Sequence, residues 1–81
     1  MYVGDKMDYF IFNLIKDIIE GYTSKYLINN NEDLNLEVSA DVSEEEKENI
    51  LYELDGKLPD GLIFIHKYDN PTLTIVFKEL K

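Results

Sequence analysis

The sequence predicts an α+β fold, a two-layer α/β sandwich in which two helices cover a three-stranded, mainly antiparallel sheet. Three observations lead to this prediction. An apolar run with helical spacing comes first, a strictly alternating segment and a helix-capping signal follow, and two segments rich in Ile, Phe, Thr and Val come last. The 81 residues contain no Cys, so we expect a single domain, 1–81, without disulfides.

The first helix is predicted to begin after Asp5 as N-cap and to end at the asparagines 29–31. At about 100° per residue, apolar side chains from Met7 to Tyr26 cover an arc of about 200°. A core-facing helix needs about half of that arc. Gly21 weakens the helix by about 1 kcal/mol relative to Ala.

Residues 34–40 alternate between apolar and polar side chains, which is the pattern of a half-buried strand. Ser43 and Glu46 then form the S-x-x-E signature of a capping box. The second helix that they open carries one narrow apolar stripe of Ile50, Leu51 and Leu54. We therefore expect this helix to bury one face and to expose the opposite one.

Residues 62–68 and 72–80 are predicted as strands joined by a three-residue loop, 69–71. This loop length places Tyr68 opposite Thr72. The resulting core face holds Ile63, Ile65, Leu73, Ile75 and Phe77, and the other, mixed face holds Leu62, Phe64, His66, Tyr68, Thr72, Thr74, Val76 and Lys78.

The predicted order of elements is therefore α-β-α-β-β. The last strand is the most continuously apolar, so we favour the sheet order 1-3-2, in which it lies between the other two. The main rival is the sequential order 1-2-3, with the first two strands parallel.

A formal net charge of −9 and a pI near 4.3 argue against direct binding of nucleic acid or of an anionic membrane. The same charge permits a protein partner with a basic groove, although acidity also serves solubility alone. The chain shows no signal-peptide pattern and no apolar run of membrane-spanning length, so we expect a cytoplasmic protein.

No pattern in the sequence indicates catalysis, a cofactor or a metal, and we expect a protein that is not an enzyme. His66 is the only histidine and has no marked partner for acid–base work. The carboxylates 44–46 fan around a helix axis, and segment 31–35 lacks the later ligands of a calcium loop.

Two surfaces remain as candidates for partner binding. One is the carboxylate face of the second helix, with Glu45, Glu48, Tyr52 and Glu53. The other is the mixed strand face, with Phe64, His66 and Tyr68, which needs to be covered or to bind something.

Two functions fit these surfaces. The first is a small protein-binding module, such as an inhibitor of the kind carried by phages and mobile elements, which imitates nucleic acid and occupies a basic groove. The alternative is a structural, self-associating protein that forms a homodimer through its apolar surplus.

Overall fold

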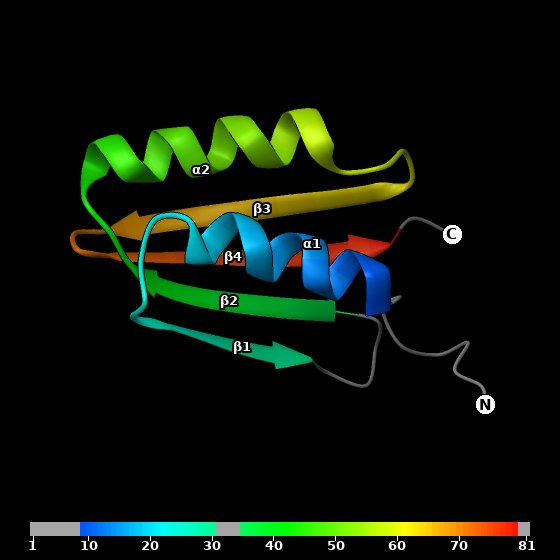
Figure 1. Cartoon of the computed structure of the whole chain (residues 1–81), viewed down its shortest axis with the longest axis horizontal. Coiled ribbons are helices and arrows are strands. Elements are labelled where there is room, and N and C mark those ends of the chain that lie inside the picture. Colours follow the sequence, from blue (N-terminus) through cyan, green and yellow to red (C-terminus); the bar gives the residue numbers. More distant parts are fainter. Residues whose placement is uncertain (1–8, 31–34, 80–81) are drawn as a thin grey trace.

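The computed structural model describes residues 9–30 and 35–79, which form six elements in the order α-β-β-α-β-β. The elements are α1 (Tyr9–Glu20), β1 (Tyr26–Asn30), β2 (Asn35–Asp41), α2 (Glu44–Lys57), β3 (Leu62–Asp69) and β4 (Thr72–Glu79). The strands form one antiparallel sheet in the order β1-β2-β4-β3. Both helices cover the same face of this sheet (Figure 1).

Helix α1 is shorter than the sequence suggests. It buries Ile11, Ile15, Ile18 and Ile19 against the sheet and ends at Glu20. The prediction that the helix continues to the asparagines at 29–31 is wrong, and the proposed cap at position 5 lies outside the described residues.

The chain leaves the helix at Gly21, whose N–H still donates to the carbonyls of Asp17 and Ile18, each at 3.2 Å. Two residues later, the Thr23 hydroxyl oxygen accepts from the Lys25 N–H at 3.0 Å, a local bond that competes with helical pairing. The segment Tyr26–Asn30 then pairs with β2 as an edge strand. A β-strand thus replaces the predicted end of the helix.

Strand β2 confirms the alternation read from the sequence. Leu36, Val38 and Ala40 are buried beneath the helices, whereas Glu37 and Ser39 lie on the opposite face. The strand pairs with β1 on one side and with β4 on the other, so it lies inside the sheet.

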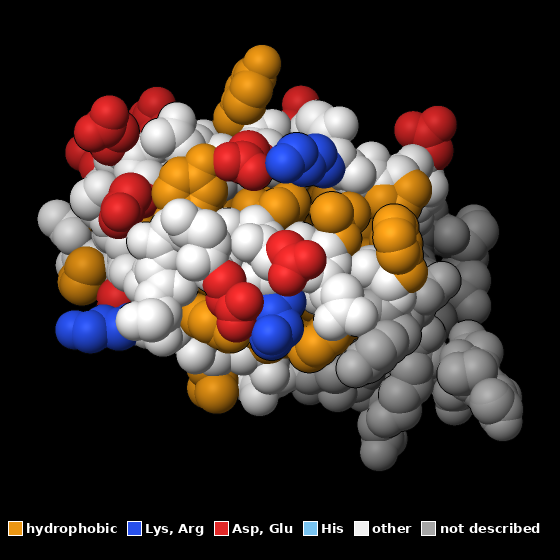
Figure 2. All heavy atoms as spheres, viewed as in Figure 1, with side chains coloured by type: hydrophobic (Ala, Val, Ile, Leu, Met, Phe, Trp, Pro, Cys, Tyr) orange, Lys and Arg blue, Asp and Glu red, His pale blue; other side chains and the backbone are white. Residues whose placement is uncertain are grey.

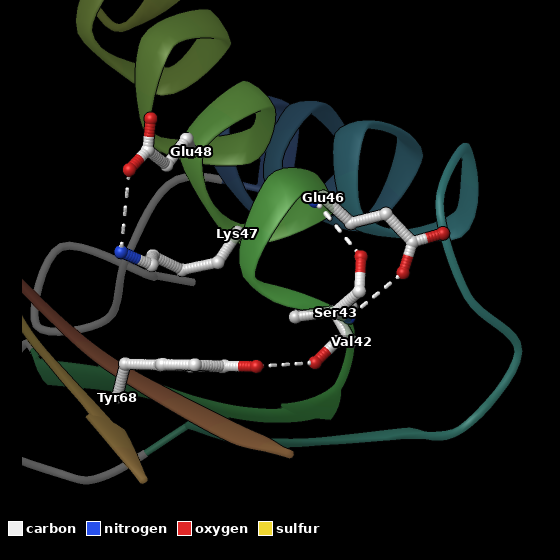
Figure 3. A network of polar contacts seen from close by, with 6 residues as sticks. All are labelled: Val42, Ser43, Glu46, Lys47, Glu48 and Tyr68. Carbon is white, nitrogen blue, oxygen red and sulfur yellow. Dashed lines mark hydrogen bonds and ion pairs between the residues drawn. The ribbon is translucent and has the colours of Figure 1, made fainter. Parts of the chain in front are cut away.

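Helix α2 begins as predicted with a complete capping box. The Ser43 hydroxyl oxygen accepts from the Glu46 N–H at 3.2 Å, and the Glu46 carboxylate accepts from the Ser43 N–H at 2.9 Å (Figure 3). Ile50 and Leu54 are fully buried, which confirms the apolar stripe. These contacts fix which face of α2 points away from the sheet.

The register of the last two strands differs from the prediction by one residue. The connection contains only Asn70 and Pro71, so Asp69 lies opposite Thr72 and Tyr68 lies opposite Leu73. Because side chains alternate between faces, this shift turns every side chain of β3 to the other side. The assignment of Ile63 and Ile65 to the core face is therefore wrong.

In the observed register, Leu62, Phe64 and Tyr68 pack against the core beneath the helices. Ile63 and Ile65 lie on the sheet face opposite the two helices and are 44% and 66% exposed. The predicted placement of Leu73, Ile75 and Phe77 in the core is confirmed, and all three are fully buried.

The α+β class with two helices is confirmed, but the sheet has four strands instead of three. Strand β4 does lie between β2 and β3, as favoured from its apolar sequence, and β1 adds to the free edge of β2. The core lies between the sheet and the helices and contains Ile11, Ile15, Ile18, Ile19, Leu36, Val38, Ala40, Val42, Ile50, Leu54, Leu73, Ile75 and Phe77.

Candidate protein-binding surface

The outward face of α2 carries a ridge of three predicted site residues, Glu45, Glu48 and Tyr52, which we call the acidic ridge. All three are exposed, and Tyr52 is 81% exposed. Their spacing of three and four residues places them on one side of the helix, opposite the buried Ile50 and Leu54. In Figure 2, acidic side chains gather over the end of the molecule where α2 begins.

Glu53, the fourth predicted residue on this helix, has a different role. Its side chain is half-buried and accepts hydrogen bonds from the Tyr22 hydroxyl and from the Lys57 ammonium, the latter at 3.2 Å. The Tyr22 hydrogen bond, with a smaller effect of Lys57, lowers the pKa of the Glu53 carboxyl. Glu53 thus joins α2 to the segment after α1 instead of extending the acidic ridge.

Phe64 and Tyr68 lie under α2, on the covered face of the sheet. The rings of Phe64 and Phe77 are 5.7 Å apart between centroids. The Tyr68 hydroxyl donates to the Val42 carbonyl at 2.8 Å, just before the helix cap (Figure 3). Of the two outcomes expected for this strand face, a cover or a bound partner, the structure gives the first for Phe64 and Tyr68, which α2 of the same chain covers.

The Tyr68 ring is half-buried at the edge of the core. The Lys47 ammonium lies 5.3 Å from the ring centroid, within the range of a cation–π contact. Burial, with smaller effects of the nearby Glu44 and Glu46 carboxylates, raises the pKa of the Tyr68 hydroxyl. His66 lies between Phe64 and Tyr68 on the same strand face, but its side chain is exposed at the sheet edge.

The structure therefore brings three of the seven predicted site residues together on one accessible surface. Within residues 9–30 and 35–79, no three His, Asp or Glu side chains converge in a way that suits a metal ion. None of the described helices is long and apolar enough to cross a membrane.

The sequence patterns did not identify the sheet face that neither described helix covers, which we call the open face. This open face carries Ile63, Ile65 and the half-buried Val76, with Leu27 at the opposite edge. The signal that finds it is the length of the β3–β4 connection. A two-residue turn at Asn70 and Pro71, instead of a three-residue loop, places both isoleucines outside.

No known protein family, curated protein or solved structure shows significant similarity to this chain.

Proposed function

We propose that the chain is a small acidic protein-binding module, without catalytic activity, that occupies a basic surface of a partner protein through the acidic ridge. The observation that carries the proposal is Tyr52, an aromatic side chain 81% exposed between carboxylates on a well-anchored helix. Exposed tyrosines contribute strongly to protein interfaces, because they bury a large area at a small cost in side-chain entropy.

The contacts that anchor α2 to the rest of the fold support this role. The capping box holds its first turn, Ile50 and Leu54 hold its middle, and the Glu53–Tyr22 hydrogen bond holds its side toward α1. A partner that binds the ridge therefore meets side chains on a pre-formed helix and does not need to order the backbone.

The charge selects the class of partner. Helix α2 carries six carboxylates and two lysines, and the whole chain has a net charge of −9. Such a surface favours lysine- and arginine-rich partners and accelerates their association. The specific form that we propose is an inhibitor that imitates the charge of nucleic acid and occupies a basic nucleic-acid groove.

Affinity capture from the cell that produces the protein tests this proposal. The bait is compared with a Glu45→Lys and Glu48→Lys variant and with a control variant, Asp17→Lys and Asp69→Lys. The control makes the same change in net charge at exposed sites on α1 and at the end of β3. We expect the wild type and the control variant to capture a nucleic-acid-binding protein. We expect the Glu45→Lys, Glu48→Lys variant to fail to capture it.

Competition with nucleic acid completes the test. The captured protein, once purified, is expected to release DNA or RNA when the wild-type chain is added, and the ridge variant is expected not to compete. Capture that the ridge variant retains at wild-type strength contradicts the assignment of the ridge.

A second candidate function is self-association through the open face of the sheet. The described charges on this face are Glu37, Asp41, Asp69, Lys67 and Lys78, which leave it close to neutral in a strongly acidic molecule. Two copies therefore repel each other least through this face, where Ile63 and Ile65 are exposed.

Sedimentation velocity tests this candidate. The candidate is supported if the wild-type chain is a dimer, if Ile65→Lys dissociates this dimer, and if Tyr52→Lys leaves it intact. A wild-type chain that sediments as a monomer at a concentration of about 100 µM, well above the range of specific dimers, rejects it.

A further inference from the structure

A groove of about 300 Å³ lies at the outer edge of the sheet, where β3 begins beneath the end of α2. Its apolar part comes from Leu54, Leu58, Leu62 and Phe64, and its acidic part comes from Asp55 and Asp60. Both aspartates are exposed, and neither forms an ion pair with a described lysine. We call this feature the edge groove.

The lining residues place the groove at the side of β3 instead of on one face. Leu62, Ile63 and Phe64 all line it, although consecutive strand residues point to opposite faces of a sheet. A position at the outer edge of the strand, near its start, reaches main-chain atoms of all three. The groove is therefore next to the main chain of β3.

That main chain is open to a further strand. β3 is an edge strand whose only neighbour in the described sheet is β4, and the pairing continues without a bulge from Leu62 to Asp69. Among the described residues, no backbone hydrogen bond joins its outer side to another segment. It contains no proline, so its outward N–H and C=O groups form a template for strand addition.

The residues that line the groove determine which side chains an added strand can place there. A lysine or arginine has an apolar stem and a charged tip, so the stem fits Leu58 and Phe64 and the tip fits the two aspartates. On the other side of an added strand, the alternate side chains lie beside Ile63 and Ile65, which favour apolar neighbours.

We propose that an extended segment of a partner protein, with alternating basic and apolar side chains, adds to β3 as a fifth strand and places a lysine or arginine in the edge groove. The inference rests on the proposed function only in that the occupant is a basic protein. Its residues are separate from Glu45, Glu48 and Tyr52, so the two sites can be tested separately.

Binding of synthetic peptides to the full chain, measured by fluorescence anisotropy, tests the inference. The probe is a peptide of alternating lysine and valine. Its controls are a peptide of the same composition with the lysines and valines in separate blocks, and an alternating peptide whose backbone nitrogens are methylated at every second residue. We expect both controls to bind at least about tenfold more weakly, because only the probe offers both the strand pairing and the alternation.

Matched variants of the protein locate the site. Asp55→Asn with Asp60→Asn removes the two groove charges and is expected to weaken probe binding about tenfold. Asp17→Asn with Asp41→Asn removes two exposed charges that lie outside both the edge groove and the acidic ridge, and is expected to change probe binding less than twofold. Circular dichroism checks that both variants remain folded.

Equal binding of all three peptides, or equal effects of the two variants, indicates attraction by net charge alone and overturns the inference. Loss of partner capture in the ridge variant together with no binding of the probe rejects the edge groove and leaves the proposed function standing. If the probe binds and the ridge variant still captures the partner at wild-type strength, the edge groove stands and the assignment of the acidic ridge is rejected.

Discussion

Tyr22 and Glu53 form the one described side-chain hydrogen bond that joins the end of α1 to α2. The bond is strongest when the carboxylate is ionised and the phenol is protonated. It lowers the pKa of Glu53, with a smaller contribution from Lys57, and raises the pKa of Tyr22, with a smaller contribution from burial. The folded state therefore gains most from this pair at pH values between the two titrations.

The first prediction concerns the pH dependence of this pair. A lowered folded-state pKa means that Glu53 stabilises the fold above its unfolded pKa of about 4.3, and this contribution is lost as the pH falls through the folded value. We expect Tyr22→Phe to lower the melting temperature at pH 7 by about 2–4 °C. We expect this difference to shrink as the pH falls below about 4.3 and the Glu53 carboxylate becomes protonated in the folded state.

Thermal unfolding followed by circular dichroism from about pH 3 to pH 7 measures this effect. Tyr52→Phe is the matched control, because it removes a phenol that is 81% exposed and should leave the melting temperature unchanged. A Tyr22→Phe difference that stays constant over the whole pH range contradicts the role assigned to Glu53.

Ser43 supports the second prediction at the residue scale. Its side chain satisfies the Glu46 N–H at the start of α2, so Ser43→Ala is expected to reduce the free energy of unfolding by about 1 kcal/mol. Ser24→Ala, at an exposed site before β1, is the control. Urea unfolding measures both variants, and equal stability of the two would show that the cap does not hold the helix.

At the scale of elements, the β3–β4 pair shows how one residue of register decides which surface is available. The two-residue connection places Phe64 opposite Phe77, in the core, and Ile65 opposite Val76, on the open face. The same strand in the alternative register has these assignments reversed. The buried or exposed state of Phe64 and Ile65 therefore tests the register directly.

The third prediction compares truncations of these neighbours. Phe64→Ala removes a ring that packs against the core and is expected to cost about 2–3 kcal/mol of unfolding free energy. Ile65→Ala truncates a side chain that is 66% exposed and is expected to cost about 0.5 kcal/mol. Urea unfolding of both variants measures the difference, and a larger loss for Ile65→Ala would favour the other register.

Local patterns predicted the parts of the fold that depend on local physics. The capping box at Ser43, the stripe of Ile50 and Leu54 and the alternation of β2 all depend on residues within a few positions of one another. The ridge residues Glu45, Glu48 and Tyr52 could be placed for the same reason, because their exposure follows from the stripe.

The predictions of the end of the first helix and of the β3 register were wrong because pairing with a strand distant in the sequence decides both. Residues 22–28 carry apolar side chains that suit a helix face as well as a strand, and pairing of Tyr26 and Ile28 with β2 settles the choice. Likewise, a two-residue and a three-residue connection between the last two strands fit the sequence equally well. The sequence alone therefore does not fix the register of β3 against β4.

At the scale of the whole molecule, the charge is distributed unevenly between the two sides of the sheet. Helix α2 has four more carboxylates than lysines, whereas the described open face of the sheet has one more. The net charge of −9 was evident from composition, but the division into an acidic helix layer and a nearly neutral sheet face depends on the register of β3. This division is the physical basis of the proposal that α2 meets a basic partner.

The most direct test of that proposal is the affinity of the purified partner as a function of salt concentration. Between about 0.05 M and 0.5 M salt, the wild type and the Asp17→Lys, Asp69→Lys control are expected to lose at least about tenfold in affinity. At low salt, Glu45→Lys with Glu48→Lys is expected to bind about 10- to 100-fold more weakly than both. Salt-independent binding, or equal losses for the ridge variant and its charge-matched control, would contradict the account.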